Sequence, residues 1–563
     1  MKHSGNLLFS LSFSLIVVLL LTACGGAATP AAQAPTEAAA PPTQPPAATE
    51  AAPSEAEPAA TEAPLTEAVP QPAQELIIGF AQDQYRLEGD GAALGVYPDN
   101  TNIGETLFKL TPEYKVIPWL AESANYLGNN TWEIKLRQGV KFHNGDEFDA
   151  EAAKWSLEKQ SRWQPLVPTD ADNIKVVDKY TLNLTTRFPF GRVMESLAHP
   201  SYTMYSSKGD PGKNPITTGP FMLESYKQNE ELVVVRNPNY WGEPPKLDKI
   251  TFRFIPDNST RVLALQSGDA DLILEVPREN AAQVAALEGV TLYQAEPAGY
   301  FALYFATKEQ QPPYDLLTDV RLRQAINYAL DKEAIAQQVY EGYALPAKSL
   351  TPPIVLPAID AGIKGFGYDP DQAAALLDEA GWILGTDGIR EQDGQKLMLT
   401  LVSGFPPANL IKPLPEVVKG QLEKAGIGVN LVEFNDIGAY YDHLDTGEVH
   451  MVIEAGTWNS ADISFIPYGL FCGCNTEGEA VLYKRFWIGD EFEEQVLQTL
   501  SATDPAEAEA AAVRAAQIWI DEFAGVAPIA YLPTLYGASN KVQGLSPHPS
   551  DLNQDWSSLS IAP

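Results

Sequence analysis

The feature that most constrains this 563-residue chain is a tract near its beginning that cannot form a hydrophobic core. Residues 25–74 consist almost only of Ala, Pro, Thr, Glu, Gln, Ser and Gly, with one Leu, one Val and no aromatic residue. A segment this poor in apolar side chains cannot offset the entropy lost on folding, and its frequent Pro favours extended polyproline II. We therefore expect residues 25–74 to be a disordered tether and the folded body to begin at Glu75.

The residues before this tract have the pattern of an export signal. Lys2 supplies a short positive region, and residues 7–21 form an almost unbroken apolar run that is too short for a comfortable membrane span. The run ends in Leu-Thr-Ala-Cys24, which resembles the lipobox of bacterial lipoproteins. The resemblance implies that residues 1–24 are a lipoprotein signal peptide and that lipidated Cys24 anchors the chain to the membrane. The alternative is an ordinary cleaved signal with a chance cysteine.

Composition excludes several kinds of partner and fold. The chain has 38 Lys and Arg against 73 Asp and Glu, a formal net charge of -35, so it would repel a phosphate backbone and we expect no nucleic acid partner. Its 3 Cys and 6 His are too few for a disulfide framework or several structural zinc sites. We therefore expect a fold held by hydrophobic packing, without a metal or cofactor.

After the tether, strand-like and helix-like patterns alternate along the sequence. Residues 76–80 are a short apolar run, and residues 131–136 alternate with a period of two, which is typical of strands. Asp149 is a helix cap before residues 150–160, and the pair Asp-Pro begins a second helix over residues 369–379. This alternation predicts an α/β fold.

Four short blocks of sequence resemble, in order and spacing, the bacterial extracellular solute-binding proteins of family 5, the peptide- and nickel-binding lipoproteins of ABC importers. The blocks combine turn, cap and aromatic residues. They are WEIKLRQGVKFHNGDEFDA at 132–150; TGPF at 218–221 with RNPNYWG at 236–242 and LQSGDAD at 265–271; VRLRQAINYALDK at 320–332; and YDP at 368–370 with AGW at 380–382.

The resemblance implies a two-lobed α/β fold of the periplasmic-binding-protein type, with an extra subdomain inserted in lobe I. We also expect residues 526–532, which are apolar enough for a buried strand, to complete lobe I. The expected divisions are residues 75–113, 213–302 and 522–563 for lobe I, 114–212 for the inserted subdomain, and 303–521 for lobe II.

The resemblance also implies a function and a location. Such proteins capture a small solute outside the cytoplasm, close two lobes over it and deliver it to the permease subunits of an ABC importer, and they are not enzymes. We expect a monomer in the periplasmic space or on the cell surface, with a peptide as the favoured solute. An oligosaccharide or a nickel chelate is the alternative within the same fold.

The segment Glu454–Asp462 resembles the Gly-Trp-x-x-Asp stretch with which peptide-binding members contact their ligand. In those members the Asp pairs with the peptide's N-terminal ammonium. Here Thr457 is extra, the usual following Asp-Pro is absent, and Glu454 lies near where some oligopeptide members place an Arg. We hypothesise that Asp462 and Glu454 present negative charge to a cationic part of the ligand, beside Trp458. The alternative is that Trp458 belongs to the core and both acids are solvated.

Three further residues are candidates for the ligand site. Tyr85 and Arg86 follow the first strand, where family members bring a loop to the cleft, and Tyr300 lies near the first expected crossing between lobes. The tyrosines could stack on a ligand or fill the core, and Arg86 could bind a carboxylate of the ligand or a surface acid.

With Cys24 lipidated, Cys472 and Cys474 are the other thiols of the chain. An oxidising compartment favours a disulfide between them. Free buried thiols are an alternative, and a metal site with His443 and His450 is another, although the spacing matches no recognised zinc motif.

A rival from another class is a surface-anchored hydrolase that uses two carboxylates. The sequence has no Gly-x-Ser-x-Gly elbow, no His-Glu-x-x-His helix and no phosphate-binding loop to favour an enzyme. A binding domain retained as a chemosensory module, without an importer, is a third interpretation.

Overall fold

The structure is a computed structural model. It describes residues 74–81, 101–160, 167, 169–210, 214–308, 311–405, 411–472 and 487–562. By its internal contacts the chain divides into residues 1–69 and 70–563, and the described residues all belong to the second unit. The predicted signal peptide and the tether up to residue 73 lie outside the described residues, as do Cys24, Tyr85, Arg86 and Cys474. Within the described ranges, every helix is too short or too polar to span a bilayer.

The folded body begins one residue earlier than expected. The Gln74 N–H donates to Asp248 Oδ2 at 2.9 Å, and the Gln74 side-chain oxygen accepts from the Ile561 N–H at 2.9 Å. Gln74, predicted as the last residue of the tether, is therefore anchored at both its backbone and its side chain.

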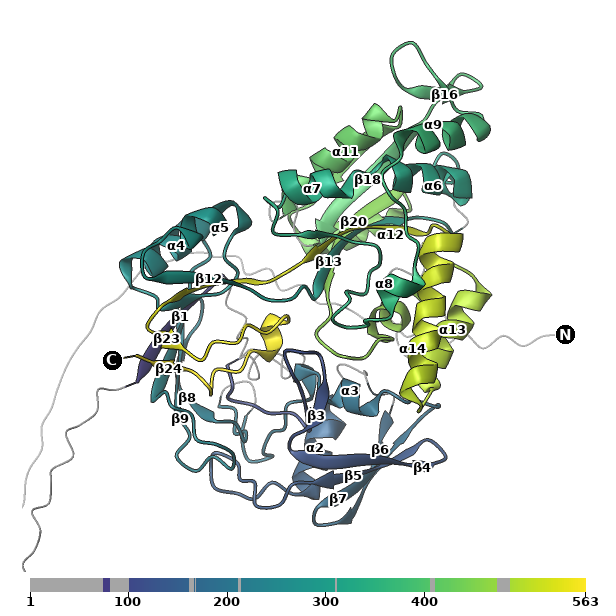
Figure 1. The fold of residues 1–563 in the computed structure, drawn as a ribbon. Coiled ribbons are helices and arrows are strands. Elements are labelled where there is room, and N and C mark those ends of the chain that lie inside the picture. The colour runs from purple at the N-terminus through teal and green to yellow at the C-terminus, as the bar shows by residue number, and fades with distance from the viewer. Residues whose placement is uncertain are drawn as a thin grey trace, which may run out of the picture. The chain divides into compact units, whose positions relative to one another are not determined.

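A seven-stranded mixed sheet forms the first lobe. Its central strand β1 is parallel to β10 and β11, and the remaining pairs are antiparallel. Helices α4 (Asn258–Ser267) and α5 (Arg278–Ala285) cover one face, and Trp556 packs with the apolar side chains of the other (Figure 1). Burial on both faces explains why β1 is a nearly continuous apolar run. In spatial order the strands are β12 (Val290–Gln294), β22 (Leu535–Ser539), β11 (Leu272–Ile273), β1 (Glu75–Phe80), β10 (Lys249–Phe254), β9 (Glu231–Arg236) and β8 (Phe221–Lys227).

A four-stranded antiparallel sheet lies in the sequence between β1 and β8. Its strand β5 (Thr131–Leu136) buries alternate residues, as its period of two predicts. Helix α2 (Ala150–Gln160) packs beside this sheet and is capped by Asp149, whose Oδ1 accepts from the Ala152 N–H at 3.0 Å. The other strands are β4 (Ala121–Gly128), β6 (Thr169–Asp178) and β7 (Thr181–Thr186), and helix α3 (Val193–Leu197) and the 3-10 turn Pro200–Tyr202 follow.

A six-stranded mixed sheet forms the second lobe, with helices on both faces. All seven residues of β13 (Gly299–Phe305) are buried, because this strand lies between β21 and β20 with side chains packed above and below. The other strands are β14 (Leu345–Pro346), β18 (Met398–Phe405), β19 (Gly428–Glu433), β20 (Met451–Thr457) and β21 (Val526–Leu532). One face carries α6 (Val320–Ala329), α7 (Lys332–Gln338), α9 (Pro370–Glu379) and α11 (Leu414–Lys424), and the other α12 (Ile437–Thr446), α13 (Asp490–Ser501) and α14 (Pro505–Ala516) (Figure 1).

The remaining elements are short. They are the strand pairs β2 (Phe108–Leu110) with β3 (Val116–Pro118) and β23 (Val542–Gln543) with β24 (Ser560–Ile561); the triplet β15 (Ile383–Leu384), β16 (Arg390–Gln392) and β17 (Gln395–Lys396); helix α8 (Ile359–Gly362); and the single turns Leu316–Thr318, Pro467–Phe471, Gln517–Glu522 and Asp551–Asn553.

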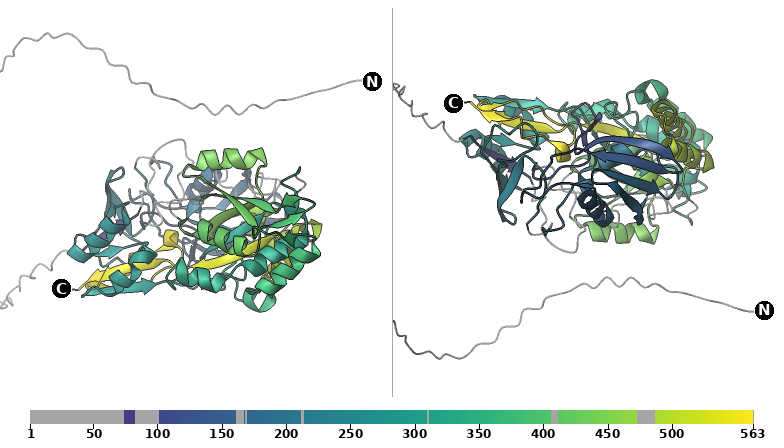
Figure 2. Two further views of the ribbon diagram at one scale, coloured as in Figure 1. Left: turned by 90° about the horizontal axis from the view of Figure 1, so that it is seen from above. Right: turned by 90° about the horizontal axis from the view of Figure 1, so that it is seen from below.

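Strand β21 belongs to the second lobe, so the expectation that residues 526–532 complete lobe I is wrong. β21 pairs with β13 and β14, and the strand that returns to the first sheet is β22. The yellow strands in Figures 1 and 2 pass from one sheet to the other within this short stretch. The structure therefore moves the two lobe crossings to residues 295–298 and 533–534. An apolar pattern predicts burial, which both sheets offer, but it does not predict the partner strand.

Candidate ligand-binding cleft

A cleft of about 750 Å³ lies at the carboxyl ends of parallel strands from both lobes. In the first lobe Ala81 follows β1 and Glu275 follows β11; in the second, Thr457 ends β20 and Ile411 follows β18. Ligands of open α/β sheets bind outside the carboxyl ends of their strands, and ligand pockets span about 300–1,000 Å³. The position and the size of this cleft are those of a site for a small solute.

Both crossings between the lobes border the cleft. Gly299 begins β13 directly after the first crossing, and Pro533 and Thr534 form the second. A cleft lined by both crossings changes shape whenever the lobes move relative to one another. This arrangement suits a hinge that closes over a bound molecule.

Aromatic and cationic side chains from both lobes stack in this cleft. The ring of Tyr340, just after α7, lies parallel to that of Phe301 on β13, with centroids 6.0 Å apart. The guanidinium of Arg278, the first residue of α5, lies 5.5 Å from the Tyr340 ring centre, and its Nη2 donates to the Pro533 carbonyl at 3.3 Å. Burial lowers the pKa of Arg278, and nearby acids oppose this shift. No sequence motif marks these three residues, because they are far apart in the chain.

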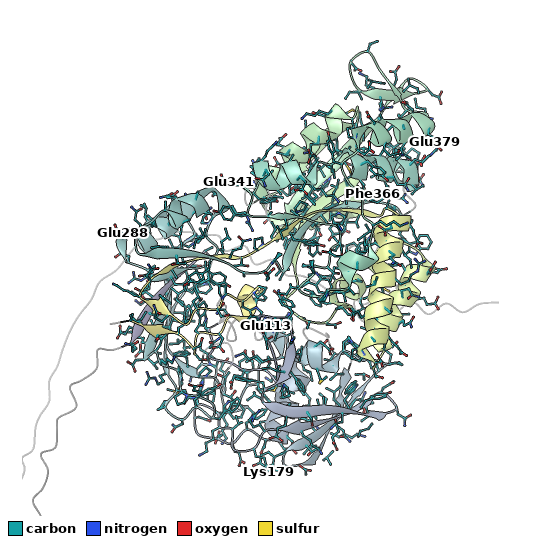
Figure 3. All side chains as sticks on the ribbon, in the orientation of Figure 1. Glu113, Lys179, Glu288, Glu341, Phe366 and Glu379 are labelled. Atoms are coloured by element: carbon teal, nitrogen blue, oxygen red, sulfur yellow. The ribbon has the colours of Figure 1, made fainter. Side chains whose placement is uncertain are left out.

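The cleft carries charges of both signs. Exposed Glu275, Glu279 and Glu341 line it together with Arg278 and exposed Lys412. Figure 3 shows Glu341 beside the end of α7. Each lobe contributes groups of both signs, Glu275, Glu279 and Arg278 from the first and Glu341 and Lys412 from the second, which suits a solute that itself has both a cationic and an anionic group.

Glu454 lies on β20 but faces away from the cleft. It is directly opposite Ala302 of β13, on the sheet face that also carries Tyr300 and Tyr304, and it is 7% exposed. Its Oε1 accepts a short hydrogen bond from the Tyr440 hydroxyl. Burial raises the pKa of Glu454 to about 7, and the Tyr440 hydrogen bond opposes this rise.

Asp462 connects the second lobe to the inserted subdomain. Its carboxylate accepts from the Ser464 N–H at 2.9 Å, the Ser464 hydroxyl at 2.5 Å and the Ser196 hydroxyl at 3.1 Å, and Ser196 lies on α3. Burial raises its pKa, and these hydrogen bonds oppose the shift. Ser460 adds a second link, since its hydroxyl donates to the Glu195 carbonyl at 3.0 Å.

The structure places Trp458 and Tyr300 in the core and not in the cleft. Trp458 is fully buried; its Nε1 donates to the Leu350 carbonyl at 2.9 Å, and its own carbonyl accepts from the Tyr114 hydroxyl. Tyr300 accepts from the Tyr304 hydroxyl at 3.1 Å on the same sheet face as Glu454. The alternative interpretation placed Trp458 in the core and both acids in solvent. Trp458 does lie in the core, but Glu454 and Asp462 are both buried, so the second part of that interpretation is wrong.

Cys472 is buried and disulfide-bonded, and its predicted partner Cys474 lies outside the described residues. The alternative metal site loses one ligand, because both ring nitrogens of His450 are engaged. Nδ1 accepts from the Thr400 N–H at 2.9 Å, and Nε2 lies 2.8 Å from the Pro313 carbonyl. Among the described residues no three His, Cys, Asp or Glu side chains gather as metal ligands.

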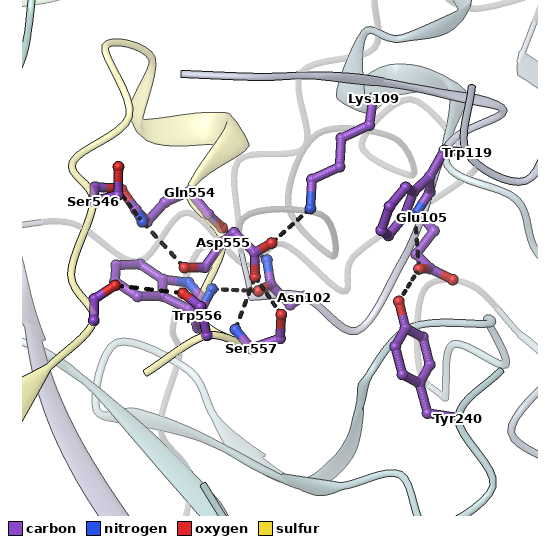
Figure 4. A network of polar contacts seen from close by, with 12 residues as sticks. Asn102, Glu105, Lys109, Trp119, Tyr240, Ser546, Gln554, Asp555, Trp556 and Ser557 are labelled. Atoms are coloured by element: carbon purple, nitrogen blue, oxygen red, sulfur yellow. Dashed lines mark hydrogen bonds and ion pairs between the residues drawn. The ribbon is translucent and has the colours of Figure 1, made fainter. Parts of the chain in front are cut away.

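The block RNPNYWG supports the scaffold through a buried glutamate that the sequence analysis missed (Figure 4). Glu105 accepts hydrogen bonds from Tyr240 at 2.7 Å and Trp241 at 2.9 Å, both within this block. It also accepts from Trp119 at 2.8 Å and Thr218 at 2.7 Å. The conspicuous aromatic residues of the motif therefore hold the backbone between β1 and β2 and do not line the large cleft.

Comparisons with known proteins agree with this geometry. The nickel-binding periplasmic protein of Escherichia coli K12 is 32% identical over 377 residues, covering 63% of this chain and 70% of that protein. The glutathione-binding protein GsiB of Salmonella paratyphi A is 34% identical over 294 residues, 49% of this chain and 55% of that protein, so the match spans about half of this relative. The crystal structure of NikA from Brucella suis in complex with Fe(III)-EDTA superposes with a TM-score of 0.74 at 25% identity, covering 86% of this chain and 99% of the other.

The fold and the cleft define a two-lobed α/β binding protein, as the sequence predicts. The family profile of the bacterial extracellular solute-binding proteins, family 5, matches residues 115–478, which is more than half of the chain. The chain belongs to this family.

Proposed function

We propose that this protein captures a peptide in the cleft between its lobes and delivers it to the permease subunits of an ABC importer. The observation that carries the proposal is the cleft itself, which is about 750 Å³ in volume, is lined by both lobes and both crossings, and carries charges of both signs. A peptide with free ends has an ammonium and a carboxylate, and a cleft with groups of both signs can hold each of them. Glutathione, which GsiB is named for binding, is a solute of the same chemical class.

Delivery depends on the two lobes closing. A solute that contacts both walls stabilises the closed arrangement over the open one by the contacts it gains on closing. A permease that binds the closed arrangement better would then recognise loaded protein. No bond of the solute is broken in this cycle, so the protein acts as a receptor and not as an enzyme.

The location that suits this role is outside the cytoplasmic membrane. The apolar run and Cys24 support a lipid anchor, and residues 25–73 would serve as the tether between the anchor and a monomeric body. Radiolabelled palmitate incorporated into the wild-type protein and absent from Cys24→Ala would support the anchor. Equal labelling of both would overturn it.

The proposed function is tested by identifying the solute that the protein retains. The protein is purified without denaturation, its mass is measured under native conditions, and the bound molecule is released and identified. A released peptide is the expected result. A nickel chelate or an oligosaccharide would keep the binding mechanism and replace the solute class.

Two other functions predict different results in the same preparation. A surface hydrolase would convert added peptides or oligosaccharides with time, whereas a binding protein leaves them intact. A chemosensory module would bind a solute but would show no binding to ABC permease subunits in membranes of the same cell.

A further inference from the structure

We propose that Arg278 and Tyr340 form an anion subsite that holds a carboxylate of the bound solute. This inference rests on the proposed solute-binding function and goes further by assigning the end of the cleft where the negative group of the solute lies. Both side chains line the cleft of about 750 Å³, Arg278 from the first lobe and Tyr340 from the second.

Both side chains have unused hydrogen-bonding capacity. Tyr340 is 6% exposed, and neither its hydroxyl nor the buried Nε of Arg278 has a hydrogen-bond partner among the described residues. Buried polar groups are nearly always paired in folded proteins, and an unpaired one is unfavourable. A ligand atom that accepts from them would remove this penalty.

Arg278 makes fewer hydrogen bonds to the protein than Arg261, which also lines the cleft. The guanidinium of Arg261 donates to the Ile255 carbonyl at 2.8 Å, the Glu275 carbonyl at 3.0 Å and Asn258 Oδ1 at 3.0 Å. For Arg278 the corresponding contact is a single hydrogen bond to Pro533 at 3.3 Å. The Nε of each arginine is unpaired, but both Nη groups of Arg261 hold the scaffold, while Nη1 of Arg278 has no hydrogen-bond partner among the described residues and remains for a ligand.

The charges around Arg278 favour an anion of the solute and not an acid of the protein. Within the described part of the chain Arg278 forms no ion pair, and Glu275 and Glu279, which raise its pKa by their charge, are exposed. The planar guanidinium donates through parallel N–H groups that match the two oxygens of a carboxylate. The Tyr340 ring centre lies 5.5 Å from this guanidinium, and the Tyr340 hydroxyl, unpaired among the described residues, is a second donor, from the other lobe.

The contacts of Arg278 also connect the subsite to lobe closure. Its guanidinium lies over the Tyr340 ring of the second lobe and bonds to Pro533 in the second crossing. A carboxylate held by Arg278 and Tyr340 together contacts both lobes at once. It would therefore stabilise the arrangement in which these two walls face one another.

The test compares two peptide pools that differ only in the carboxylate. Pools of di- to pentapeptides are prepared as free acids and as C-terminal amides, and retention by the wild-type protein is measured by native mass spectrometry. The tightest free acid and its amide are then measured by calorimetry. Variants are Arg278→Gln, Tyr340→Phe, which preserves the ring that packs on Phe301, and the control Arg253→Gln on β10, outside the cleft.

We expect free acids to bind and amides to bind at least about tenfold more weakly, the range of a charged hydrogen bond. Arg278→Gln should abolish this preference, Tyr340→Phe should reduce it a few fold, and Arg253→Gln should leave it unchanged. Melting temperatures show whether each variant folds. If Arg278→Gln does not fold, Tyr340→Phe still tests the subsite.

Two results would overturn the inference and can be told apart. Equal binding of acids and amides, or a preference that survives in both Arg278→Gln and Tyr340→Phe, removes the subsite and leaves peptide binding intact. Failure of both pools to bind overturns the peptide function and, with it, this subsite.

Discussion

Two buried glutamates, one between β1 and β2 and one on β20, differ in the number of hydrogen-bond donors around their carboxylates. Glu105 accepts from the side chains of Trp119, Thr218, Tyr240 and Trp241. Glu454 is equally removed from water but accepts, among the described residues, a hydrogen bond from Tyr440. Burial raises the pKa of both acids. The number of donors, and not burial, separates a carboxylate that holds the scaffold from one whose charge stays poorly compensated.

The largest expected effect is the loss of the Glu105 network. Glu105→Ala leaves the four donors around Glu105 without their acceptor and should lower the free energy of unfolding by about 4 kcal/mol. Urea unfolding followed by tryptophan fluorescence measures this change. Glu113→Ala, at an exposed position, is the matched control and should change stability by less than about 0.5 kcal/mol. A loss below about 1 kcal/mol for Glu105→Ala would remove the contrast between the two glutamates.

Glu454 should make the free energy of unfolding depend on pH. Because its pKa is about 7 in the folded protein and 4.5 ordinarily, the folded state binds this proton more tightly than the unfolded chain does. Its contribution to stability is therefore fully present below pH 4.5 and is lost as pH rises to about 7, by roughly 3 kcal/mol. Glu454→Gln is neutral throughout and should lack this fall.

The measurement is urea unfolding of wild type and Glu454→Gln between pH 5 and pH 8. The difference between the two proteins isolates Glu454 from the other titrating groups, and Glu113→Gln serves as the control. Parallel stability curves for wild type and Glu454→Gln would show that the carboxylate is better compensated than the comparison implies.

A smaller effect is expected at Asp462, which resembles Glu105 in having several donors. Ser196→Ala removes one of its hydrogen bonds and the direct link from α3 to the second lobe, and should lower stability by about 1 kcal/mol. Ser259→Ala, at an exposed position of α4, is the control for a surface serine. If both serine variants unfold at the same urea concentration, the Ser196 link does not stabilise the lobe contact.

Much of the local structure was predictable from adjacent residues. Helix α2 occupies residues 150–160 behind the Asp149 cap, and α9 begins behind Asp369, whose Oδ1 accepts from the Gln372 N–H at 2.9 Å. The alternation over residues 131–136 predicted β5 correctly. These features depend on side-chain periodicity and on hydrogen bonds within a few residues, so the sequence contains the whole interaction.

The candidate site was much less predictable. The segment Glu454–Asp462 drew attention because it resembles a ligand-contacting motif, but its acids are buried, and neither lines the large cleft. Arg278 and Tyr340 carry no local pattern of their own. They become candidates for ligand binding only because the fold brings them together in the cleft, although 62 positions of sequence separate them.

By itself, the sequence determined the α/β class, the helix and strand patterns along the body, and the resemblance to a family of solute-binding proteins. Only the tertiary structure decided that β21 joins the second lobe, that Glu105 collects the aromatic donors of the RNPNYWG block, and that Arg278 faces Tyr340. The reason is physical: caps and periodicity act within a few residues, whereas strand partners and buried hydrogen bonds depend on chain segments that meet only after folding.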